Sequence, residues 1–144
     1  MEIIIVSLCA WALAQLSKVT VDIIRTKQFD FRVLTGTGGM PSSHTAIVTS
    51  LATSVAIVDG FKSTAFAIAA ILALIVMYDA AGVRRSVGKQ AVVLNRILKE
   101  LRERRPASYF EKDLRELIGH TTLEVFVGAC LGIAVSYTWF VYLA

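Results

Sequence analysis

The sequence predicts an all-α integral membrane bundle of about four transmembrane helices, with an additional cytoplasmic amphipathic helix. Of its 144 residues, 56% are hydrophobic and 18% are charged, whereas soluble domains are about 45–50% apolar and about 25% charged. The apolar residues are gathered in blocks rather than spread along the chain. Because the length suits one domain, residues 1–144 are interpreted as a single membrane-embedded unit.

Four apolar stretches define the predicted spans. The first and the last, residues 3–24 and 121–143, reach the roughly 20 residues that cross ~30 Å of hydrocarbon. The middle two, residues 45–58 and 63–78, are shorter, and the tight turn at 59–62 joins them into a predicted hairpin. The first stretch lacks a preceding basic segment, which favours a retained helix over a cleaved signal peptide.

Positive charge is unequally divided between the two sides of this arrangement. With four spans, loops 25–44 and 79–120 share one side, and both termini lie on the other side with the turn at 59–62. Of the 15 Lys and Arg residues, only Lys62 belongs to the side of the termini. The positive-inside rule therefore predicts that both large loops are cytoplasmic.

The larger loop contains a predicted amphipathic basic helix at residues 87–101. Apolar residues recur there every three or four positions, basic residues fill much of the rest, and Pro106 follows the end of the pattern. Such a helix would lie on an anionic membrane surface or pack on the protein's own cytoplasmic face, and both interpretations stay open. A second short helix is predicted at 109–117.

A glycine-rich segment precedes the second apolar stretch. In residues 36–45, glycines such as Gly39 let the backbone turn its amides toward a ligand, and a helix start adds unpaired N–H groups. Ser42 and Ser43 add hydroxyl donors, and His44 adds a titratable group. The segment indicates either an anion site or a glycine-rich turn followed by an N-cap serine.

The only other histidine opens the last apolar stretch. His120 and Glu124 are four residues apart, so they share one face of a helix. A carboxylate there can hold one ring nitrogen and leave the other free to attack an electrophile. A glutamate one turn into a membrane helix is costly, which favours a functional role. The alternative is a Glu–His contact that caps the helix.

Basic residues lie at the same predicted membrane level as both histidines. Lys18 and Arg25 are two helical turns apart on one face of the first helix. Arg84 and Arg85 follow the third span, just beyond Asp79. Each is either a snorkelling anchor or part of a phosphate clamp. Their gathering near both histidines favours the clamp, since guanidinium groups suit phosphate oxygens.

These motifs resemble the signatures of the type-2 phosphatidic acid phosphatase superfamily, which includes the vanadium haloperoxidases. Lys18 and Arg25 match its Lys-x6-Arg-Pro signature without the proline. Residues 41–44 match Pro-Ser-Gly-His with serine for glycine, and His120 with Glu124 matches the end of Ser-Arg-x5-His-x3-Asp. Across essentially the whole chain, the sequence is similar to the divergent branch, which consists of small bacterial and plastid membrane proteins.

One departure concerns the arginine that normally lies six residues before the nucleophilic histidine. In this chain it is displaced far upstream, to Arg84 or Arg85, and the basic helix is inserted between them and His120. Asp79 has no counterpart in the signatures and is interpreted as orienting one of these arginines.

The resemblance implies an integral membrane phosphatase that hydrolyses a lipid phosphate monoester, such as phosphatidylglycerophosphate or phosphatidic acid, without a metal or other cofactor. His120 would attack phosphorus and form a phosphohistidine, while Glu124 would hold its ring. His44 would protonate the leaving group and then activate water. The implied substrate-binding residues are Lys18, Arg25, Gly39, Ser42, Ser43, Asp79, Arg84 and Arg85.

Three other functions fit the same pattern: a polyprenyl diphosphate phosphatase, a vanadate-dependent peroxidase, and a non-catalytic protein that binds lipid headgroups or a partner. A cytoplasmic site favours a phospholipid made on that leaflet, and a membrane-embedded site favours a lipid over peroxidase substrates. The expected setting is a bacterial inner membrane with the site facing the cytoplasm. The expected partners are the membrane and a lipid phosphate, with no nucleic acid. Short spans bury little surface, which makes a homodimer plausible.

Overall fold

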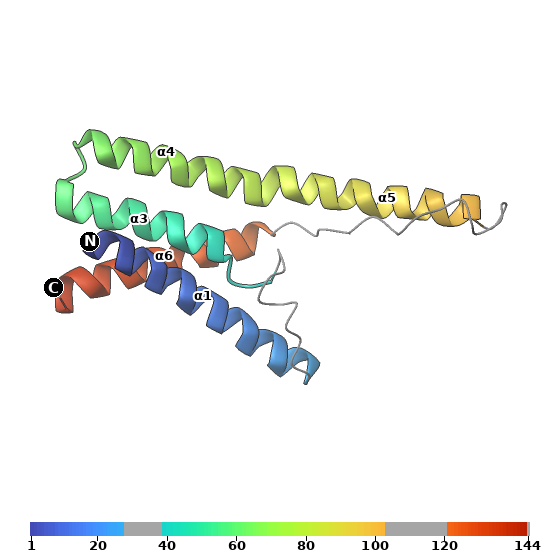
Figure 1. Cartoon of the computed structure of the whole chain (residues 1–144), viewed down its shortest axis with the longest axis horizontal. Helices are drawn as coiled ribbons and strands as arrows, with labels where there is room; N and C mark the ends of the chain where they lie inside the picture. The colour runs from blue at the N-terminus through green and yellow to red at the C-terminus, as the bar shows by residue number, and fades with distance from the viewer. Residues whose placement is uncertain (28–38, 103–120, 144) are drawn as a thin grey trace.

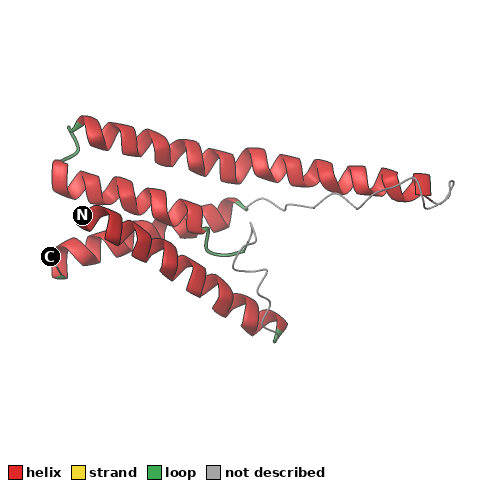
Figure 2. Cartoon of the chain, viewed as in Figure 1, coloured by secondary structure: helices red, strands yellow, loops and turns green. Residues whose placement is uncertain are grey.

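The computed structural model describes residues 1–27, 39–102 and 121–143, and every regular element in those ranges is helical (Figure 2). The bundle helices are α1 (Glu2–Thr26), α3 (Ser43–Asp59), α4 (Thr64–Tyr78) and α6 (Thr122–Tyr142). A π-turn, η1 (Asp79–Val83), connects α4 to α5 (Arg84–Arg102). The predicted all-α membrane bundle is confirmed, whereas the predicted helix at 109–117 lies outside the described residues.

Helix α3 lies in the middle of the bundle, because it packs against α1, α4 and α6. The start of α1, the end of α6 and the turn between α3 and α4 lie together at one end (Figure 1). The starts of α3 and α6 lie together at the other end, toward which α1 and α4 run (Figure 1). Successive bundle helices therefore run in alternating directions, as the prediction of four spans requires.

Within the described residues, three helical segments are long and apolar enough to cross a membrane: Glu2–Ile24, Thr64–Lys99 and Thr122–Tyr142. Helix α3 has 17 residues, which is near the lower limit of about 17–25 residues for a span. Its central position explains its composition, since a helix surrounded by protein can carry hydroxyl groups that would be costly against lipid. The buried hydroxyl residues of α3 are Ser43, Thr45, Thr49, Ser50 and Ser54.

Small residues bring α3 and α6 into close contact. Gly128, Gly132 and Ser136 recur every fourth residue along α6, and all three are buried. A Cβ atom on Gly132 would collide with the Thr49 hydroxyl and the Ala46 carbonyl of α3. In membranes, such small residues let helix backbones approach closely enough for van der Waals packing and hydrogen bonds across the interface.

Ser136 joins α6 to α3 through a cluster of hydroxyl groups. Its Oγ lies 2.8 Å from Ser50 Oγ, accepts a hydrogen bond from Ser54 Oγ at 3.1 Å, and donates to the Ser50 carbonyl at 2.9 Å. These are buried hydrogen bonds between residues far apart in the chain, so their loss leaves polar groups without partners inside the bundle.

We therefore expect Ser136→Ala to lower the free energy of unfolding by about 1 kcal/mol. Thermal unfolding in detergent measures the effect. The control is Thr138→Ala, because the exposed Thr138 hydroxyl bonds only to carbonyls of its own helix, Ala134 and Val135. Equal midpoints for the two variants would contradict a role for the hydroxyl cluster in joining the helices.

Helices α4 and α5 form one continuous rod through η1 (Figure 1). The sequence predicted a separate helix beginning near residue 87, and this separation is wrong. The segment 64–102 contains no proline, and the π-turn accommodates Gly82 without ending the helix.

Among the described elements, α5 packs appreciably only against η1. Packing on the protein's own cytoplasmic face is therefore not seen there, and docking on a membrane surface stays a prediction.

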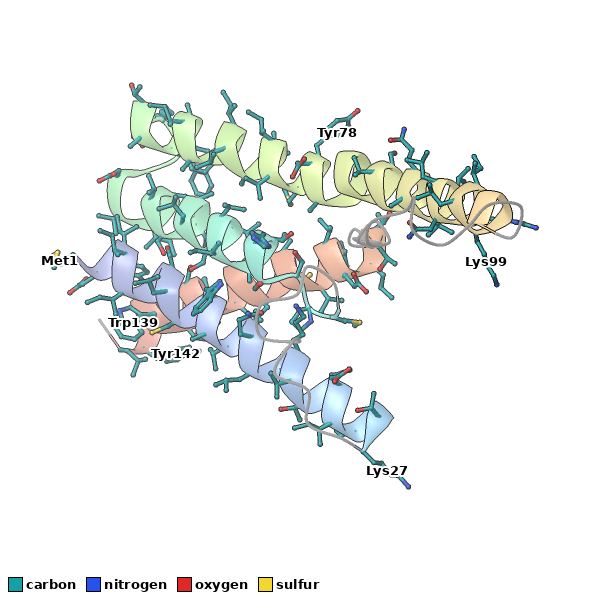
Figure 3. All side chains as sticks on the ribbon, turned by 45° about the vertical axis from the view of Figure 1, so that its right-hand side comes forward. Met1, Lys27, Tyr78, Lys99, Trp139 and Tyr142 are labelled. Carbon is teal, nitrogen blue, oxygen red and sulfur yellow. The ribbon has the colours of Figure 1, made fainter. Side chains whose placement is uncertain are left out.

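Aromatic side chains mark the bundle end that is opposite to the starts of α3 and α6. Trp139 and Tyr142 lie near Met1, whereas Lys27 and Lys99 lie near the far ends of α1 and α5 (Figure 3). Tryptophan and tyrosine are enriched where a membrane meets water. The bundle thus has an aromatic end and a basic end, consistent with a span between them.

Candidate active site

Helices α3 and α6 begin side by side at the basic end of the bundle. The Ser42 N–H donates a hydrogen bond to the Glu124 carbonyl at 3.1 Å, which joins the entry to α3 to the first turn of α6. From this point both helices run in the same direction (Figure 1). Their N-terminal ends, which carry partial positive charge, therefore lie close together and favour an anion.

The entry to α3 is shaped by Gly39 and Ser42. Gly39 has φ of +88°, a conformation that glycine adopts without steric cost. Ser42 is the N-cap, and its Oγ accepts hydrogen bonds from the Thr45 N–H at 3.4 Å and the Thr45 hydroxyl at 3.0 Å. The N-cap interpretation of this segment is thus correct for Ser42, whose side chain is fully buried.

Ser43 and His44 form the first turn of α3. Ser43 is buried, and His44 is exposed. Because His44 is only two residues from the Ser42–Glu124 hydrogen bond, its backbone is held at the junction of α3 and α6.

Glu124 belongs to a capping box at the start of α6. The Thr121 hydroxyl accepts from the Glu124 N–H at 3.3 Å, and the Glu124 carboxylate accepts from the Thr121 N–H at 3.0 Å. Sequence reasoning had assigned this carboxylate only to His120. The Thr-x-x-Glu spacing was the signal for the cap. Since a carboxylate accepts several hydrogen bonds, the cap leaves capacity for an imidazole.

Lys18 reaches this junction from the interior of α1. Its side chain is only 5% exposed and lies against Gly39, on which a Cβ atom would come within 3.0 Å of Lys18 Cε. Gly39 lies three residues before Ser42, whose N–H is bonded to the Glu124 carbonyl. The structure therefore brings together Lys18, Gly39 and Glu124, three of the residues that the sequence selected.

For the candidate arginines, the structure describes the backbone position but not the side chain. Arg25 lies near the end of α1, where this helix diverges from the bundle (Figure 1). Asp79 begins η1, which contacts α6, and Arg84 and Arg85 begin α5 directly after it. Their backbones thus follow a contact with α6, and π-turns are frequent at functional sites. The three arginine side chains and all of His120 lie outside the described residues.

The described part of this region has the chemistry of an anion site. It offers one buried ammonium, two helix starts and two serines. Within the described ranges, no group of three or more His, Cys, Asp or Glu side chains is placed to hold a metal ion.

Comparison with known proteins identifies the family of this chain. A family described as "Divergent PAP2 family" matches residues 1–135. The chain belongs to the divergent PAP2 family. It is 44% identical over 139 residues to YuiD, an uncharacterized membrane protein of Bacillus subtilis (strain 168), in an alignment that covers 90% of this chain and 88% of YuiD. No solved structure matches the chain.

Membership of the divergent PAP2 family confirms the resemblance to the type-2 phosphatidic acid phosphatase superfamily. The matched range includes every residue proposed for the site, from Lys18 to Glu124. A PAP2-like protein with apolar helices, similar to a bacterial membrane protein, is itself a membrane protein.

Proposed function

We propose that this divergent PAP2 protein hydrolyses a phosphate monoester of a membrane lipid. The observation that supports the proposal most is that buried Lys18 lies against Gly39, beside the point where the Ser42 N–H joins the start of α3 to Glu124 of α6. Such an arrangement supplies positive charge and N–H donors, which are the main requirements of phosphoryl transfer. A site at one end of a membrane bundle favours a lipid, with phosphatidylglycerophosphate and phosphatidic acid as the candidate substrates.

In the first proposed step, a ring nitrogen of His120 attacks phosphorus in line with the ester oxygen of the lipid. The P–N bond forms as the P–O bond breaks, and protonated His44 gives its proton to the departing alkoxide. Glu124 stabilises the positive charge that develops on the His120 ring. Its cap to Thr121 holds this carboxylate at the base of α6, one helical turn from His120 in the sequence.

In the second step, His44, now neutral, takes a proton from water, and the water oxygen attacks phosphorus. The P–N bond breaks, and inorganic phosphate leaves. Throughout both steps, Lys18 and the arginines offset the negative charge of the phosphoryl oxygens. The serines at the start of α3 donate hydrogen bonds to the same oxygens. Since Lys18 is buried beside Gly39, water screens its charge less than that of an exposed lysine.

Phosphate release from a substrate panel tests this function. Purified protein in detergent is given short-chain phosphatidic acid, phosphatidylglycerophosphate and a polyprenyl diphosphate, each at matched concentration. We expect turnover of at least one monoester and little or no turnover of the diphosphate. Failure on every lipid phosphate would instead favour a protein that binds lipid headgroups.

The proposed orientation places the site in the cytoplasm of a bacterial cell, because Lys62 is the only Lys or Arg predicted on the opposite side. We expect Lys62→Cys to react with a membrane-impermeant thiol reagent added outside spheroplasts, and Lys99→Cys to react only after permeabilisation. The background replaces Cys9 and Cys130, the two free cysteines. A cytoplasmic position for residue 62 would reverse the orientation.

A homodimer is also part of the proposal. Helix α4 packs chiefly on α3 and turns large apolar side chains outward, among them Ile68, Ile71 and Leu74. Within the membrane, such a face is available to lipid or to a second copy of the chain. Cross-linking of the protein in native membranes tests it.

A further inference from the structure

Helix α6 holds the backbone of Ser42 at two places that are one helical turn apart. The Glu124 carbonyl accepts the Ser42 N–H at 3.1 Å. Gly128 lies so close that a Cβ atom on it would be 2.5 Å from the Ser42 carbonyl oxygen and 3.1 Å from Thr45 Cβ. The peptide groups on both sides of Ser42 are thus positioned by α6.

The same Ser42 carbonyl also begins α3. It accepts the Ala46 N–H at 3.0 Å, the first hydrogen bond of that helix. It cannot move away from Gly128 without moving the first turn of α3, which carries His44. Because the obstructing atom is a backbone oxygen rather than the end of a flexible side chain, no rotamer change relieves the contact.

We propose that Gly128 is a positioning residue that sets the spacing between the start of α3, which carries His44, and the start of α6, which His120 precedes in the sequence. This inference rests on the proposed function, in which His120 and His44 act on opposite sides of one phosphorus atom. Their separation then has to match the in-line geometry of the reaction. A misplacement of about 1 Å from a residue that touches no substrate can cost about 100-fold in rate.

The two glycines of α6 provide a matched test. Gly128 contacts the entry to α3, whereas Gly132 contacts Thr49, Ala46 and Ser50, one turn deeper in the membrane. Both alanine variants should lower the thermal unfolding midpoint. We expect Gly128→Ala to lower kcat by about tenfold or more with a smaller change in KM, and Gly132→Ala to keep most of kcat at a similar midpoint. Equal losses of kcat in the two variants would overturn the proposal.

Gly82→Ala provides a neutral control, since no described atom outside its own stretch of helix lies within 4 Å of where its Cβ atom would be. We expect this variant to keep the wild-type kcat, and a loss as large as that of Gly128→Ala would overturn the specific role of Gly128.

Hydrogen exchange separates failure of this inference from failure of the proposed function. The Ser42 amide should exchange as slowly as the interior amides of α3 in the wild-type protein, whether or not it hydrolyses a lipid. Fast exchange at Ser42 would overturn the inference even if every variant were too unstable to assay. An inactive wild-type protein with a protected Ser42 amide would overturn the phosphatase instead, and with it the catalytic role given to Gly128.

Discussion

We expect His120→Ala to abolish phosphate release, with a loss of at least roughly 10³-fold in kcat. The covalent route depends on this imidazole as the nucleophile, and the chain has only one other histidine, His44. His44 lies in the first turn of α3, where it is proposed to act as the acid and base. It is therefore not expected to replace the lost nucleophile. Release of inorganic phosphate from the best lipid of the panel measures the effect.

His44→Ala is the matched variant, because it removes the only other imidazole of the chain. We expect it to reduce turnover of an alkyl phosphate by about 10²–10⁴-fold, the usual contribution of general acid–base catalysis. With an aryl phosphate the leaving group needs no proton. His44→Ala should then still form the phosphoenzyme and accumulate it, because activation of water is lost.

The chemistry of the trapped intermediate distinguishes a histidine from other nucleophiles. A phosphohistidine is labile in acid and stable in base, and it should be absent from His120→Ala. Undiminished phosphate release by His120→Ala would remove this residue as the nucleophile. An acid-stable phosphoenzyme would point to a hydroxyl group instead.

Lys18→Met should lower kcat/KM by about 10²-fold. Lys18 is buried beside Gly39, and removing one preorganised donor to a transition-state oxygen commonly costs about 10²–10³-fold. Methionine keeps an unbranched apolar chain of similar length in that space. Removing one buried charge from among charged neighbours can itself destabilise a fold, so a melting curve is measured to separate loss of folding from loss of catalysis.

Lys27→Met is the control for Lys18→Met. It makes the same substitution on the same helix, but Lys27 is exposed and caps the end of α1. Figure 3 shows it at the end of α1 that lies away from the rest of the bundle. We expect its kcat/KM to stay within about twofold of wild type, as for an exposed charge screened by water. Similar losses in the two variants would mean that Lys18 acts only through the overall charge of the protein.

Much of the helical framework was predictable because composition reports directly on contact with lipid. The apolar blocks placed all the bundle helices to within a few residues, and the Lys and Arg count separated the two ends of the bundle. The break between α4 and α5 was predicted wrongly. Hydropathy falls sharply after Tyr78, but a change of solvent does not end a helix when no proline or competing cap is present.

Within the site, the sequence indicated residue types more reliably than their partners. Glu124 was chosen as a site residue because a charged side chain in a membrane helix costs free energy. The hydrogen bond that the structure describes for its carboxylate comes from the Thr121 N–H. The Thr-x-x-Glu spacing would have predicted this bond because a capping box is local. The close approach of Gly128 to Ser42 was not predictable in the same way, since nothing near Gly128 in the sequence identifies the helix that it faces.

The sequence by itself determined which segments are helical, which end of the bundle is basic and which side chains are suited to phosphate chemistry. These properties follow from local composition and from spacing along one helix. Only the tertiary structure decided that Lys18 lies on Gly39, that Ser42 is tied to Glu124 and that Gly128 limits their spacing. Such contacts join residues from different helices. They depend on how those helices pack, and in an apolar helix the pattern of side chains hardly distinguishes a face that meets protein from one that meets lipid.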